Sequence, residues 1–118
     1  MVAVTSLLRS FRCAGRGIVL ACRDRNMRIM LGAAIAVIVV AALCSVSSMH
    51  WAILVLCIGV VLSAEAMNSA VERCIDQIEL RYDREVRDIK DLAAGAVLLI
   101  SVVAAIVGGV VLWPYLAP

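Results

Sequence analysis

The sequence predicts an all-α membrane protein, with an N-terminal amphipathic surface helix followed by three transmembrane helices. Of its 118 residues, 64% are hydrophobic and 17% are charged, whereas a soluble domain is about 45 to 50% apolar and about 25% charged. The charged residues are confined to 9–28 and 65–91, which leaves two long apolar segments. A net charge of +2 and an aromatic content of 4% also argue against a nucleic-acid partner.

The first predicted element is the surface helix, over about residues 5–27. Its apolar stretches are short, and Arg9, Arg12 and Arg16 recur through it. This pattern is typical of an interfacial helix and unlike a signal peptide, which carries one continuous apolar stretch. The arginines either only anchor the helix at the membrane surface or also contact a phosphate-bearing ligand, and the pattern alone leaves both open.

The first apolar segment, residues 29–64, is predicted to cross the membrane twice. As one helix its 36 residues would measure about 54 Å, too long for a hydrocarbon core of about 30 Å. A polar cluster before Trp51 supplies the turn, and Trp51 is a plausible interface anchor. We therefore expect spans over 28–47 and 51–71, the second continuing as a helix to about residue 80. The polar cluster consists of Ser45, Ser47, Ser48 and His50.

A cytoplasmic link over 81–91 and a third span over 92–113 complete the predicted single domain of residues 1–118. The third span is followed by an aromatic pair, Trp113 and Tyr115, and Pro114 between them is expected to stop the helix. All eleven Lys and Arg residues precede the first span or lie between the second and third. The positive-inside rule therefore puts the N-terminus and the charged segment in the cytoplasm and the C-terminus outside.

One polar stripe runs along the second span and its extension. At 100° per residue, its members fall within an arc of about 80°. Glu65 lies fourteen residues after Trp51, about 21 Å along the helix and close to the cytoplasmic boundary. A carboxylate inside the membrane costs roughly 2.5 to 3.5 kcal/mol, so a functional cation-binding role is favoured over a structural contact between helices. The stripe consists of Glu65, Asn68, Glu72, Asp76 and Glu79.

Two function classes fit these patterns. One is an enzyme that uses a metal at the membrane surface, and the other is a small proton- or cation-coupled transporter with Glu65 as its site. The sequence holds no phosphate-binding glycine loop and no zinc-protease motif. Basic residues recur every three positions from Arg81 to Lys90, each near an acid, which is typical of a solvated, ion-paired helix face.

Two motifs resemble a known family. Glu65–Asp76 has the pattern ExxNxAxExxxD, and Lys90-Asp91-Leu-Ala-Ala-Gly-Ala-Val follows fourteen residues later. Both resemble the signature of the prokaryotic diacylglycerol kinase and undecaprenol kinase family. The resemblance implies a homotrimer in a bacterial inner membrane, with active sites shared between neighbouring subunits. It also implies transfer of the γ-phosphoryl group of ATP, with Mg²⁺, to the hydroxyl of a membrane lipid.

The same resemblance implies roles for individual residues. Glu65 matches the family's general base, and Asn68 would orient Glu65 or the substrate. Glu72 and Asp24 would bind Mg²⁺. Asp24 stands where the family usually has Glu. The nucleotide-binding residues would be Asp76, Tyr82, Lys90, Asp91, Arg12 and Arg16. The substrate-binding residues would be Glu65, Arg9 and Ser69.

Two segments of the sequence bear on the identity of the lipid substrate. The segment Asp24–Ile29 looks more like the undecaprenol kinase branch, whereas Asn68-Ser69 resembles the diacylglycerol kinase branch. We therefore expect undecaprenol to be slightly favoured. The apolar spans, rich in Val, Ile, Ala and Leu, discriminate poorly between lipid tails.

Overall fold

The protein is all-helical. A computed structural model describes residues 1–78 and 83–117, and in this part of the chain four helices follow one another. Glu79 and Tyr82, which belong to the expected stripe and nucleotide site, lie outside the described residues. The helices are α1 (Val2–Ala21), α2 (Arg25–Leu43), α3 (Ser48–Ile78) and α4 (Arg84–Leu116).

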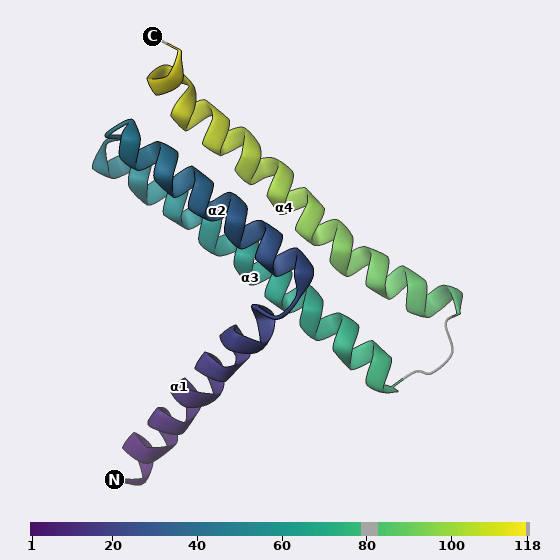
Figure 1. The fold of residues 1–118 in the computed structure, drawn as a ribbon. Coiled ribbons are helices and arrows are strands. Elements are labelled where there is room, and N and C mark those ends of the chain that lie inside the picture. Colours follow the sequence, from purple (N-terminus) through teal and green to yellow (C-terminus); the bar gives the residue numbers. More distant parts are fainter. Residues whose placement is uncertain (79–82, 118) are drawn as a thin grey trace.

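Helices α2, α3 and α4 form an antiparallel bundle, and α1 projects away from it (Figure 1). Helix α3 packs against both α2 and α4. All three bundle helices are long and apolar enough to cross a membrane. The prediction of an all-helical chain with three candidate spans is therefore confirmed.

The turn between α2 and α3 closes α2 with a short hydrogen-bonded cap. Ser45 adopts a left-handed backbone conformation, with φ of 53°. The Ser45 N–H donates to the Ala42 carbonyl and the Val46 N–H donates to the Ala41 carbonyl, each at 3.3 Å. These bonds satisfy carbonyl groups that the helix end would leave unpaired. The predicted hairpin therefore lies where the serine cluster begins.

A small apolar core lies beside this turn. Ala41 and Val46 pack there with Leu54 of α3 and Val111 of α4, and all four are buried. Tyr115 reaches the turn from the end of α4, where its hydroxyl accepts a hydrogen bond from the Ser47 N–H at 3.3 Å. We call this part, with the turn 44–47 and Tyr115, the hairpin end.

The opposite part of the bundle carries the charges. We call it the charged end and define it by Asp24, Glu65, Arg73, Asp76 and Lys90. Helix α4 begins there with Asp83 as its N-cap. The Asp83 carboxylate accepts a hydrogen bond from the Val86 N–H at 2.9 Å, which satisfies one of the free donors of the first turn.

The ends of α1 and α4 differ from the expected ones in ways that have a physical reason. Helix α1 ends at Ala21 instead of continuing to 27, because Asp24 has an extended backbone and serves as the N-cap of α2. Pro114 does not stop α4, and this prediction was wrong. The helix continues to Leu116, because a proline this close to the end removes only one backbone donor, and the Ala117 N–H still bonds to the Trp113 carbonyl at 2.9 Å.

Candidate functional site

Glu65 and Asn68 are the buried polar residues within the part of the chain that the structure describes. Their exposed fractions are 3% and 6%. They lie one turn apart on α3, which places the Asn68 amide beside the Glu65 carboxylate. The Asn68 Oδ1 atom has no hydrogen-bond partner. A buried carboxylate in an apolar helix is costly, so Glu65 marks a candidate functional site.

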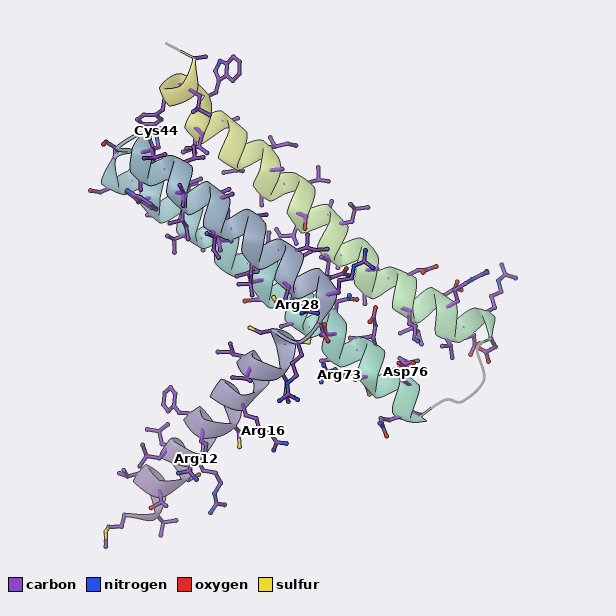
Figure 2. The ribbon with its side chains drawn as sticks, viewed as in Figure 1. Arg12, Arg16, Arg28, Cys44, Arg73 and Asp76 are labelled. Atoms are coloured by element: carbon purple, nitrogen blue, oxygen red, sulfur yellow. The ribbon has the colours of Figure 1, made fainter. Side chains whose placement is uncertain are left out.

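Two further stripe residues lie nearer the end of α3. Glu72 is exposed, and Asp76 forms an ion pair with Lys90 of α4 in which Nζ and Oδ1 are 2.6 Å apart. The pair brings together two residues expected to bind the nucleotide. Asp91, the neighbour of Lys90, is exposed on α4. Figure 2 shows Asp76 at the charged end of α3.

Asp24 reaches the same end of α3 from the break between α1 and α2. Its carboxylate lies 3.1 Å from the Arg73 guanidinium. Hydrogen bonds from the Ser69 side chain and from Arg73 hold the pKa of Asp24 below its ordinary value, despite some desolvation of the carboxyl group. The structure thus brings an expected metal ligand, Asp24, next to an expected substrate residue, Ser69.

Sequence reasoning missed Arg73. It follows Glu72 and lies one turn beyond Ser69, and it carries the basic group nearest to the predicted stripe. This position marks Arg73 as a candidate partner for a nearby carboxylate, without saying which one. The ion pair itself depends on how α2 and α3 are placed in space, which the sequence pattern does not specify.

A cavity of about 580 Å³ separates the end of α1 from α2 and α3. Its walls are largely apolar, with residues such as Ile18, Met27 and Leu62. Asp24, Ser69 and Arg73 also line it. The cavity therefore offers an apolar space beside a carboxylate, a hydroxyl and a guanidinium.

The carboxylates could contribute to a magnesium site. The carboxylates of Glu72 and Asp24 both lie close enough to repel the charge of the Glu65 carboxylate. Among residues 1–78 and 83–117, no three His, Cys, Asp or Glu side chains gather closely enough to hold a metal by themselves. Mg²⁺ in kinases is commonly bound by one or two carboxylates together with substrate phosphate oxygens. The donor set of Asp24 and Glu72 fits that chemistry.

The arginines of α1 lie apart from these groups. Every residue from Met1 to Val19 is exposed, and the described residues form no ion pair between a carboxylate and Arg9, Arg12 or Arg16. Figure 2 shows Arg12 and Arg16 extending from the same side of α1. One chain alone therefore does not bring these three predicted ligand contacts to Glu65.

Comparison with known proteins identifies the family. Residues 12–112 match the family model of prokaryotic diacylglycerol kinase. The chain is 37% identical to an undecaprenol kinase of Bacillus subtilis over 109 residues, 92% of this chain and 89% of the relative. It is 39% identical to a diacylglycerol kinase of Synechocystis over 111 residues, again 92% of this chain but only 63% of that relative's length. The chain therefore belongs to the prokaryotic diacylglycerol kinase family and is a lipid kinase.

Proposed function

We propose that this lipid kinase transfers the γ-phosphoryl group of ATP, with Mg²⁺, to the hydroxyl of a membrane lipid alcohol at the charged end of the bundle. The observation that carries the proposal is the buried carboxylate of Glu65, one turn from the buried amide of Asn68 on an apolar helix. A lipid hydroxyl lies near the headgroup level of the bilayer. Its general base must therefore be carried at that depth, which Glu65 on α3 would provide.

In the proposed reaction Glu65 accepts the proton of the lipid hydroxyl. The lipid oxygen forms a bond to the γ-phosphorus as the bond from that phosphorus to the bridging oxygen of ADP breaks. The products are the phosphorylated lipid and ADP, and the proton leaves from Glu65 to water. Asn68, one turn along α3 from Glu65, orients the Glu65 carboxylate or the substrate. A positioned base of this kind contributes about 10² to 10⁴ in rate.

The remaining charged residues would hold the donor. Asp24 and Glu72 would bind Mg²⁺, which when bound neutralises charge on the phosphate oxygens. The Asp76–Lys90 ion pair would present an ammonium group to the nucleotide, with Asp91 beside it. Arg12 and Arg16 complete the proposed nucleotide contacts together with Tyr82, and Arg9 and Ser69 the proposed lipid contacts.

We infer that the active enzyme is a homotrimer whose neighbouring subunits share active sites. In one chain α1 projects from the bundle, so its arginines do not reach the Glu65 region. A neighbouring subunit could bring them together. In the proposed orientation, α1 lies on the cytoplasmic surface of a bacterial inner membrane, with the charged end inside and the C-terminus outside.

Undecaprenol is proposed as the slightly favoured substrate over diacylglycerol. The support is the segment Asp24–Ile29, together with the relative from Bacillus subtilis, which aligns with this chain over most of both lengths. Asn68-Ser69 is the feature that points the other way. The preference is therefore expected to be a modest ratio of rates.

Phosphate transfer from γ-labelled Mg-ATP tests the proposal. The purified protein in mixed micelles is offered undecaprenol and diacylglycerol separately, with Glu65→Gln as the matched control. We expect label in the lipid fraction with wild type and a loss of label with the variant. The ratio of rates measures the preference. An unlabelled lipid fraction from a folded wild-type trimer with both alcohols would contradict the proposed function.

A further inference from the structure

A second polar atom besides Asn68 Oδ1 is buried without a partner within the described residues. It is the hydroxyl oxygen of Ser101 on α4. A buried hydroxyl that forms no hydrogen bond is unfavourable, because it has lost its bonds to water and gained none in exchange. Such a group needs an explanation, and a ligand that supplies the missing bond is one.

Ser101 lies at nearly the same depth along the bundle as Glu65. Two contacts set the register of α3 against α4, the Asp76–Lys90 ion pair and the approach of Leu54 to Gly108. Glu65 is midway between Asp76 and Leu54, and the corresponding midpoint on α4 is residue 99. Ser101 is two residues beyond that midpoint, about 3 Å along the helix axis.

Ser101 lines an apolar cavity of about 550 Å³ between α2, α3 and α4. No charged side chain is among the described residues that line it. On α3 the lining includes Leu54, Ile58 and Val61. These residues share a helix face with Glu65, because successive steps of four, three and four residues return to the same side. The cavity and the Glu65 carboxylate therefore follow one another along α3.

We propose that Ser101 is a positioning residue for the lipid alcohol, with the lipid tail in the apolar cavity and the lipid head between Ser101 and Glu65. The inference rests on the proposed function. The Ser101 hydroxyl donates a hydrogen bond to an oxygen of the lipid head, while the reacting hydroxyl donates to Glu65. In undecaprenol the only oxygen is that of the reacting hydroxyl, so Ser101 would donate to it. Diacylglycerol also offers ester carbonyl oxygens as acceptors.

The cavity fits this occupant in three ways. Its walls are apolar, it extends along α4 from Ser101 to Leu116, and its polar group lies at the depth of the base. The helix from Ser101 to Leu116 is about 22 Å long, which is most of a hydrocarbon core of about 30 Å, so the cavity offers apolar lining along a long lipid tail. A charged or nucleotide ligand would find no matching charge there.

Steady-state kinetics of the full-length protein in phosphatidylcholine vesicles test the inference, with undecaprenol and diacylglycerol in separate series at saturating Mg-ATP. For Ser101→Ala we expect the KM for the lipid to rise about fivefold, the effect of one buried neutral hydrogen bond. We expect kcat and the KM for ATP to stay within about twofold of wild type. We expect the thermal midpoint to stay within about one degree of wild type. Ser101→Thr retains a hydroxyl and is expected to restore the KM.

Val102→Ala is the matched control, because it removes atoms at the next position of α4 on its exposed side. An unchanged lipid KM in Ser101→Ala with both alcohols overturns the inference while leaving the proposed function intact. An equal rise in Val102→Ala overturns it as well, because the effect would then come from general perturbation of α4. A wild type that phosphorylates neither alcohol would instead overturn the proposed function on which the inference rests.

Discussion

The two ends of the bundle differ in whether their polar groups have hydrogen-bond partners. At the hairpin end the Tyr115 hydroxyl accepts from the Ser47 N–H and lies 2.6 Å from His50 Nδ1, so it has a partner on either side. Because this hydroxyl already accepts one bond, its own proton is available to His50. At the charged end Glu65 and Asn68 are buried, and Asn68 Oδ1 has no partner.

This difference separates structural from functional residues. Satisfied polar groups around an apolar core hold helices together, and their value is stability. A buried carboxylate and an unpaired amide oxygen weaken the fold unless a ligand completes them, which supports the proposed roles of Glu65 and Asn68 in the reaction. Substitutions at the hairpin end should therefore affect stability, and substitutions at the charged end should affect activity.

The largest expected effect is that of Glu65→Gln. The amide keeps the size of the side chain but cannot accept the proton of the lipid hydroxyl, so kcat is expected to fall about 10³-fold. The thermal midpoint should be retained or raised, because a neutral group replaces a buried carboxylate. Initial rates of lipid labelling and a melting curve on the same preparation check both parts. A variant that loses both its fold and its activity would contradict the claim that Glu65 serves activity and not stability.

Asp24→Asn is expected to raise the Mg²⁺ concentration needed for half-maximal rate by at least tenfold, because one proposed carboxylate ligand is lost. A magnesium titration at fixed ATP measures this. Arg73→Gln is the matched control, since it removes the ion pair with Asp24 but leaves the carboxylate. Equal shifts in the two variants would show that the ion pair, rather than a metal, explains the effect.

Val111→Ala tests whether the hairpin end contributes to stability and not to activity. Val111 is buried in the core beside the turn, so its truncation leaves a small cavity and should lower the free energy of unfolding by about 1 to 2 kcal/mol. Turnover per folded molecule should stay at the wild-type value. Val110→Ala is the control, because Val110 is 70% exposed on the same helix and should change stability little. Reversible unfolding in mixed micelles measures the free energies.

Tyr115→Phe has the smallest expected effect. It removes the hydroxyl that bridges Ser47 and His50, and should lower the free energy of unfolding by about 1 kcal/mol without changing turnover. The same unfolding assay detects the change. His50→Ala combined with Tyr115→Phe should add little to Tyr115→Phe alone, because Tyr115→Phe already removes the bond between Tyr115 and His50. Fully additive losses would mean that the bridge contributes nothing.

Much of the fold could be predicted from the sequence because the membrane restricts it. The length of the apolar segment 29–64 required a turn, and the structure has one at the serine cluster. The break before Asp24 was missed, since the amphipathic pattern continues through it and the N-cap that divides α1 from α2 is a local backbone choice. The end of α4 was misplaced, because Pro114 is compatible with a last helical turn.

The candidate site could be predicted only where it follows one helix. The periodicity of α3 placed Glu65 and Asn68 on one face, and both are buried together. The contacts between helices depend on register, which periodicity does not give. For that reason the Asp24–Arg73 ion pair and the depth of Ser101 beside Glu65 emerged only from the structure.

The most direct test of the central claim is to measure phosphate transfer and unfolding side by side for wild type, Glu65→Gln and Tyr115→Phe in one vesicle preparation. We expect Glu65→Gln to transfer almost no phosphate to lipid yet to unfold at or above the wild-type temperature. We expect the reverse for Tyr115→Phe, with full transfer per folded molecule and a lower unfolding temperature. Substantial transfer by a folded Glu65→Gln variant would contradict the claim that this buried carboxylate is the base of the kinase.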